Sequence, residues 1–85
     1  WFAAYFFGND GDTSAKMVKD GSLYKCEKPS GDYANVIFVR MNPSYTSFAW
    51  AGSWNQTGDL VIPTDGRNLY TVTGWGANDG KWSTK

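Results

Sequence analysis

The chain has 85 residues, which suffices for one small hydrophobic core and one shallow site but leaves no room for a cleft with its own lids. Eight basic and eight acidic side chains cancel, so there is no excess positive charge to neutralise phosphates, and a nucleic acid partner is disfavoured. Histidine is absent and there is a single cysteine, which removes the commonest general base and any thiolate metal cage. The longest apolar run, residues 1–7, is too short to insert across a bilayer.

Short apolar or alternating segments, each bounded by turn residues, follow one another along the first third of the chain. Residues 2–7 predict a first strand, and the Gly-, Asn- and Asp-rich stretch 8–12 predicts a loop. A short run at 15–18 precedes Asp20-Gly21, which is typical of a hairpin turn. Residues 22–27 then alternate as a strand does. No long window repeats its apolar positions at helical spacing, so we expect no helix longer than a single turn.

Residues 35–41 form the most apolar segment, and their lack of alternation predicts a central strand buried on both faces. Residues 44–58 are small and polar but carry four aromatic side chains, which favours an ordered loop packed by its own residues. Two further strands are expected at 59–62 and 69–72, and the Gly-rich tail 74–85 either closes a sheet edge or frays. The pattern predicts an all-β fold, a small antiparallel β-sandwich that is immunoglobulin-like in broad shape but lacks the Cys–Trp–Cys landmark.

The polar and nucleophilic residues give little indication of catalysis. The Asn9–Asp12 stretch lacks the further oxygen ligands and the closing Glu of a calcium-binding loop, so a plain turn is the better interpretation. The chain has one glutamate, Glu27, and most aspartates lie beside glycine, where turn formation explains them better than a pair of hydrolytic carboxylates. Cys26 lies on the apolar face of a predicted strand, as a buried inert thiol does. We therefore predict no enzyme activity, no metal and no cofactor.

Aromatic residues make up 18% of the chain, more than a core of this size can hold, so some of these rings are expected on the surface. Sugars present apolar C–H faces and a rim of hydroxyls, which aromatic rings and amides can contact together. Tyr5 and Phe7 are two apart in a strand and therefore point to the same face. Trp54, Asn55 and Gln56 offer a ring and two amides in succession. An aromatic pair on a strand can equally be core, but in the absence of acid–base groups the combination favours carbohydrate binding.

Several motifs along the chain resemble carbohydrate-binding module family 26, a family of starch-binding modules attached to bacterial amylases and to surface proteins that handle amylopectin. The likeness covers nearly the whole chain, and the Gln-Thr-x-Asp-Leu element at 56–60 is its most specific part. The other matching segments are Ala4-Tyr-Phe-Phe7, Lys16-Met17, Leu23-Tyr24, Asn35-Val-Ile-Phe38, Pro63-Thr-Asp-Gly66 and Leu69-Tyr70.

This resemblance implies a non-catalytic β-sandwich module that binds α-1,4-linked glucan, as starch or maltooligosaccharide, between two aromatic rings set at an angle. It implies that residues 1–85 are one module excised from a larger protein. That protein would be secreted or displayed on a bacterial cell surface, with covalently linked neighbouring domains. Tyr5 and Phe7 fall where the family's first-strand aromatics lie, and Gln56 falls on its polar contact.

The chain departs from the family pattern in one respect: the family commonly has a tryptophan shortly before the methionine that matches Met17, whereas residues 12–16 here contain no aromatic side chain. The predicted site is therefore Tyr5, Phe7 and Trp54 with the amides of Gln56 and Asn55, and Trp50 and then Trp75 are the next candidates for the second ring. The alternative function is an immunoglobulin-like protein–protein adhesion module that uses the same aromatic patch as its interface.

Overall fold

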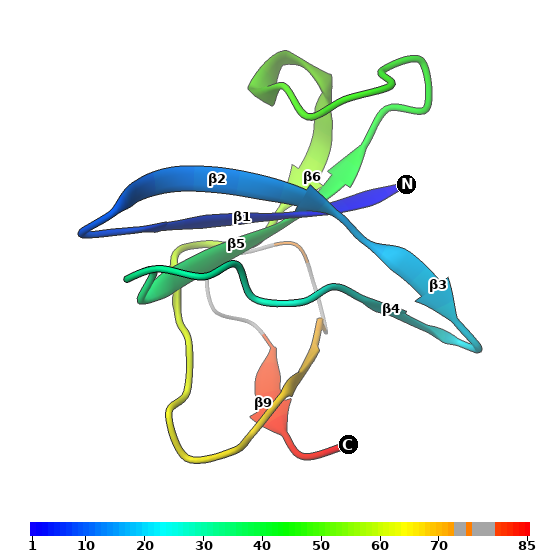
Figure 1. Cartoon of the computed structure of the whole chain (residues 1–85). Helices are drawn as coiled ribbons and strands as arrows, with labels where there is room; N and C mark the ends of the chain where they lie inside the picture. The colour runs from blue at the N-terminus through cyan, green and yellow to red at the C-terminus, as the bar shows by residue number, and fades with distance from the viewer. Residues whose placement is uncertain (73–74, 76–79) are drawn as a thin grey trace.

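A computed structural model describes residues 1–72, 75 and 80–85 of the chain (Figure 1). The central sheet has five strands, and every pairing in it is antiparallel. Its main path runs in the order β2-β1-β5-β6, and β7 pairs with β5 as well. The strands are β1 (Phe2–Gly8), β2 (Gly11–Lys16), β5 (Asn35–Met41), β6 (Ser53–Gln56) and β7 (Leu60–Val61).

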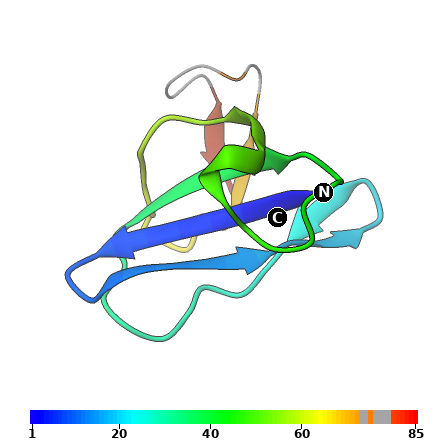
Figure 2. The ribbon, with the colours of Figure 1, turned by 90° about the horizontal axis from the view of Figure 1, so that it is seen from above.

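Two smaller antiparallel sheets complete the described fold. One joins β3 (Val18–Asp20) to β4 (Leu23–Lys25), and the other joins β8 (Leu69–Thr71) to β9 (Lys81–Ser83). In the view of Figure 1, β9 lies below the central sheet, and the segment between β5 and β6 rises above it. Seen from above, that segment lies over β1 (Figure 2). It contains the short 3₁₀ helix η1 (Trp50–Gly52).

The central sheet carries a separate hydrophobic cluster on each face, because strand side chains alternate in direction. The face that bears Tyr5, here called the Tyr5 face, has a buried cluster of Ala3, Ile37, Val39 and Met41. The other face, here called the Phe38 face, has Ala4, Phe6, Val36 and Leu60. β5 supplies residues to both clusters, as expected for the strand predicted to be buried on both sides.

The turn between β1 and β2 is tighter than the loop predicted at 8–12. The two strands stay in register up to the pair Gly8 and Gly11, and Gly11 adopts a positive φ of 96°. The Asp10 carboxylate accepts the Asp32 backbone N–H at 2.6 Å, and Asn9 Nδ2 donates to Asp32 Oδ2 at 2.8 Å. These bonds tie the turn to the segment before β5, and they occupy the polar groups that had suggested a calcium loop.

The prediction of an all-β, antiparallel fold is confirmed. In the described residues the longest helical element is η1, of three residues, and no helix is long and apolar enough to cross a membrane. The β-sandwich form stays a prediction. The two-stranded β8–β9 sheet packs Tyr70 and Trp82 against the Phe38 face.

The expectation that residues 44–58 form a loop throughout is wrong, because residues 53–56 form β6. This strand is held by pairing with β5 rather than by its own apolar pattern. At the other end of the chain, residues 81–83 form β9 and pair with β8 instead of fraying. Residues 74 and 76–79 of the predicted tail lie outside the described part of the structure.

Candidate functional site

Four aromatic rings gather on the Tyr5 face and form what we call the aromatic platform: Tyr5, Phe7, Phe48 and Trp50. The Tyr5 ring centroid is 4.9 Å from that of Trp50, 5.6 Å from that of Phe48 and 5.9 Å from that of Phe7. The Trp50 ring stands at 65° to Tyr5 and at 79° to Phe48. Because Trp50 is 43% exposed and the other three are half-buried, the platform is open to solvent.

The platform is assembled from one strand and one ordered loop. Alternation along β1 brings Tyr5 and Phe7 to the same face, as the sequence predicted. The loop, residues 42–52, is closed by a hydrogen bond between its ends, in which Asn42 N–H donates to Gly52 O at 2.8 Å. A second bond, from Trp1 Nε1 to Tyr45 O at 2.8 Å, ties its first half to the N-terminus.

Gly52 allows the loop to pack as it does. A Cβ atom at this position would lie 2.6 Å from the Tyr45 ring, a distance that real side chains essentially never show. Because Gly52 ends η1, any residue with a side chain here would displace the short helix that begins at Trp50. The position of the Trp50 ring therefore depends on the absence of a side chain two residues later.

Tyr5 is held at its polar end by Asp12. The phenolic hydroxyl donates a hydrogen bond to the Asp12 carboxylate, which comes from the neighbouring strand β2. This hydrogen bond, with smaller effects of burial and of the Asp12 negative charge, raises the pKa of the Tyr5 phenol above its ordinary value. Tyr5 is therefore neutral around pH 7, with its ring held from both ends.

Polar side chains surround the platform on the same face. The strand register places Ser14 opposite Tyr5, Asn35 opposite Phe7 and Gln56 opposite Val39. Gln56 is exposed, and its Oε1 accepts a hydrogen bond from Ser53 Oγ at 3.3 Å. These hydroxyl and amide groups are of the kind that contact sugar hydroxyls.

Thr57, the second residue of the Gln-Thr element, has a structural role. It is 2% exposed, and its Oγ1 accepts the Phe38 N–H at 3.1 Å and donates to Gly58 O at 2.9 Å. Its own N–H donates to Phe38 O at 2.9 Å. Thr57 thus closes the end of β6 against β5, and Gln56 beside it stays on the surface.

Trp54 and Asn55 are not part of this cluster. The pairing of β5 with β6 shifts register between Arg40 and Met41, and Trp54 lies at this irregularity. The guanidinium carbon of Arg40 lies 5.1 Å from the centroid of the Trp54 ring, and Arg40 Nη1 donates to Asn55 Oδ1 at 3.4 Å. Arg40 alternates with Val39 and Met41, so its side chain leaves β5 on the Phe38 side.

Of the five predicted site residues, the structure therefore brings Tyr5 and Phe7 together, puts Gln56 on the same face and separates Trp54 and Asn55. Trp50, the next candidate for the second ring, contacts Tyr5 directly. Sequence reasoning missed Phe48, because no periodic pattern indicates where a loop residue will pack. It also missed Asp12 as the partner of Tyr5, although a two-residue turn at 9–10 would have placed the two side chains on one face.

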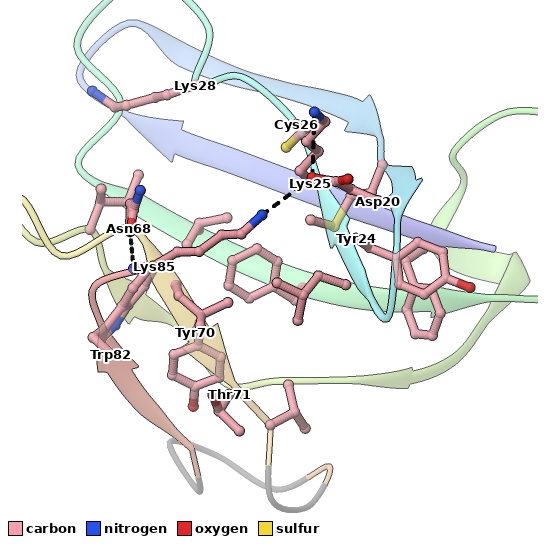
Figure 3. Close-up of a pocket in the computed structure, with 18 of the residues that line it drawn as sticks. Asp20, Tyr24, Lys25, Cys26, Lys28, Asn68, Tyr70, Thr71, Trp82 and Lys85 are labelled. Carbon is pink, nitrogen blue, oxygen red and sulfur yellow. Dashed lines mark hydrogen bonds and ion pairs between the residues drawn. The ribbon is translucent and has the colours of Figure 1, made fainter.

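Apart from the platform, a concave region lies on the Phe38 face, between the β3–β4 and β8–β9 sheets (Figure 3). It encloses about 730 Å³. Tyr70 and Trp82 pack in it at 5.1 Å between ring centroids, and Tyr70 lies 5.6 Å from Phe38. Trp75, the third candidate ring, stacks on Phe2 at 6.4 Å and lines this region too, away from Tyr5.

Three of the charged side chains that line this region are paired with one another. Lys85 Nζ lies 3.3 Å and Lys25 Nζ 3.6 Å from the same Asp20 oxygen. The hydrogen bond from Lys85, followed by the charges of the two lysines, lowers the pKa of the Asp20 carboxyl. The Cys26 thiol packs against the buried hydrophobic cluster of the Phe38 face. Burial raises the pKa of this thiol, which disfavours the reactive thiolate. The paired charges and the raised pKa of the thiol therefore favour the aromatic platform over this region as the candidate polar site.

Comparison of the chain with protein-family models, with curated proteins and with solved structures finds no match. Within the residues that the structure describes, no three His, Cys, Asp or Glu side chains come together as metal ligands. The likeness to carbohydrate-binding module family 26 rests on the sequence motifs alone.

Proposed function

We propose that this chain is a non-catalytic carbohydrate-binding module that holds α-1,4-glucan against the aromatic platform. The observation that supports this most is the exposed Trp50 ring, set at 65° to Tyr5 and 4.9 Å from it. Two rings inclined to each other form a shallow, angled surface that suits a curved glucan chain better than a flat one. The proposal revises the predicted site in two respects, since Trp50 replaces Trp54 as the second ring and Asn55 is no longer among the platform's polar contacts.

The chemistry of the surroundings also favours a neutral, hydroxyl-rich ligand. Ser14, Asn35 and Gln56 lie on the platform's face and offer donors and acceptors to hydroxyls. The chain has no net charge, so no strong field selects for an ionic partner. Gln56 is also the residue that matches the polar contact of family 26.

A shallow site of this size should bind modestly. A few stacked sugar rings and amide contacts correspond to a dissociation constant of about 10–100 μM, or about −5.5 to −7 kcal/mol. Such a module becomes effective when it is tethered, because a linked neighbour binds at a high effective concentration. We therefore also propose that it acts within a secreted or cell-surface bacterial protein, joined to further domains such as an amylase.

The proposal is tested by titration of the chain with maltoheptaose, compared with the cellulose fragment cellohexaose. We expect binding of the first in the stated range and none of the second. Trp50→Ala should abolish most of the binding, whereas Val18→Ala, which removes an exposed apolar side chain elsewhere, should leave it unchanged.

Absence of maltoheptaose binding by the folded chain would overturn the proposal. The same exposed aromatic cluster would then favour the alternative, a protein–protein adhesion module.

A further inference from the structure

We infer that Trp54, Arg40 and Asn55 form a second glucan contact, on the opposite side of the central sheet from the platform. This inference rests on the proposed function, since it assigns the same class of ligand to a second surface. We call these three residues the Trp54 site. A domain with both sites would hold two glucan chains, or two stretches of one chain, at once.

The first supporting observation is the exposure of Trp54. It is 52% exposed, more than Trp50, although tryptophan is usually the largest apolar side chain that a small domain has to bury. It lies on β6, a strand of the central sheet, and not on a terminus or a long loop. The register shift beside it directs the ring toward Arg40 instead of into the cluster on the Tyr5 face.

The second observation is that two polar side chains lie beside the ring. Arg40 is held twice: its guanidinium stacks on the Trp54 ring, 5.1 Å from the centroid, and its Nη1 donates to Asn55 Oδ1 at 3.4 Å. A guanidinium has five N–H donors in a rigid plane, and the bond to Asn55 uses one of them. The guanidinium covers one face of the ring, so a sugar would stack on the other face and reach the remaining N–H donors and the amide at its edge.

The third observation is that the two sites are separate. Trp50 packs on Tyr5, whereas Trp54 packs on Arg40, which points away from Val39 and Met41 of the Tyr5 face. Among the described aromatic pairs, none joins Trp54 to Tyr5, Phe48 or Trp50. A short oligosaccharide on one ring should therefore not contact the other, and the two should bind independently.

The experiment is a titration of the whole chain with maltotriose, followed by NMR through the indole N–H signals of the individual tryptophans. In the unaltered chain we expect the Trp50 and Trp54 signals to shift along separate binding curves. In Trp50→Ala the Trp54 curve should persist with its affinity unchanged within about twofold, because the two rings have different partners and sites without shared partners behave independently. In Trp54→Ala the Trp50 curve should persist in the same way.

Arg40 provides a sharper variant. Arg40→Lys keeps the charge but loses the planar donors and the stacking, so affinity at Trp54 should fall by about tenfold while affinity at Trp50 stays the same. Val18→Ala is the matched control, because it removes an exposed apolar group away from both sites and should change neither curve. The far-ultraviolet spectrum and the melting temperature of each variant verify that it is folded.

The possible results separate the two proposals. A Trp54 signal that does not move while Trp50 titrates normally overturns the second site and leaves the proposed function standing. Loss of the Trp54 curve in Trp50→Ala means one continuous site, which also overturns it. If neither signal moves with maltotriose or maltoheptaose, both the second site and the proposed function fail.

Discussion

Tyr5 and Asp12 are joined across the β1–β2 hairpin by a hydrogen bond from the phenol to the carboxylate. The two residues lie diagonally on one face of the paired strands, because Tyr5 is opposite Ser14 and Asp12 is opposite Phe7. The bond fixes the polar end of a ring whose apolar body packs on Phe48 and Trp50. It makes Asp12 a positioning residue for the platform, and this has a consequence for the titration of Tyr5.

We expect the pKa of Tyr5 to lie above the ordinary value for a tyrosine, because the phenol donates a hydrogen bond to Asp12 and the Asp12 carboxylate repels the phenolate. Since the folded-state pKa is raised above the unfolded value of about 10, the resulting stability is fully present below pH 10. It is lost as the pH rises through the folded-state pKa. Ultraviolet titration of the tyrosinates, with Tyr5→Phe to identify the signal, measures this pKa.

Asp12→Asn is the informative variant for this shift. It removes the negative charge, so the Tyr5 pKa should move back toward its ordinary value. Asp59→Asn, which removes an exposed carboxylate elsewhere, should leave it unchanged. An unaltered Tyr5 titration in Asp12→Asn would show that the two side chains are not in contact in solution.

Gly52→Ala should weaken both folding and glucan binding. The added methyl group would lie 2.6 Å from the Tyr45 ring, which cannot move freely because Trp1 bonds to the backbone beside it. Overpacking of this kind costs about 1–3 kcal/mol, and the displaced η1 would carry Trp50 away from Tyr5. Thermal unfolding and a maltoheptaose titration measure the two effects.

The control for Gly52→Ala is Ala51→Ser, a small change at the neighbouring exposed position of the same short helix, which should alter neither quantity. A Gly52→Ala protein with unchanged stability and unchanged binding would mean that η1 does not pack on Tyr45.

Thr57→Val should cost stability but not binding. The change keeps the shape of the side chain and removes the hydroxyl, so the part-buried Phe38 N–H loses its acceptor. An unsatisfied buried donor lowers the free energy of unfolding by about 1–3 kcal/mol. The additional methyl group of valine is apolar, so its burial offsets part of this loss. Chemical denaturation measures the loss, and the exposed Thr64→Val serves as the comparison. If maltoheptaose affinity fell as well, Thr57 would have a role in the site itself.

Glucan binding should be almost independent of salt and of metal ions. The proposed ligand is uncharged, so affinity should change by less than about twofold between about 50 and 500 mM salt, in contrast to the steep loss for phosphate contacts. A chelator should have no effect, since the Asp10 carboxylate is engaged by the Asp32 backbone and the site uses rings and amides. A steep salt slope would favour an acidic partner, and calcium-restored binding would contradict the assignment of residues 9–10 to a plain turn.

The parts of the fold that the sequence predicted well are those with a local apolar signal. β1 and β5 coincide closely with the predicted strands 2–7 and 35–41, because their side chains fill two clusters and had to be apolar. β6 was missed because its four residues are held by backbone pairing with β5, which leaves no mark on the residue pattern. Hairpin β8–β9 was predicted only in part, since the pairing joins segments on either side of a Gly-rich stretch.

In the candidate site, too, the parts with a local sequence signal were predicted and the parts set by long-range packing were not. The shared face of Tyr5 and Phe7 follows from strand alternation, and the structure agrees. Trp54 was grouped with them because it precedes Gln56 in the chain, but one extra residue in β6 opposite Arg40 reverses the direction of such a side chain. The approach of Trp50 to Tyr5 depends on how the connection between β5 and β6, residues 42–52, folds back over the sheet, which local patterns do not encode.

β5 contributes to both hydrophobic clusters, as β1 does, and it pairs with β1, β6 and β7, which has a consequence for how the molecule opens. The two faces cannot come apart independently while β5 is in place, so its amide hydrogens should exchange with solvent only when the whole domain unfolds. The connection that carries Phe48 and Trp50 rests on one face alone, and its amides should exchange by smaller local openings. A bound glucan would be expected to slow exchange in that connection far more than in β5, so the same experiment that maps the most persistent part of the fold would also outline the ligand's footprint.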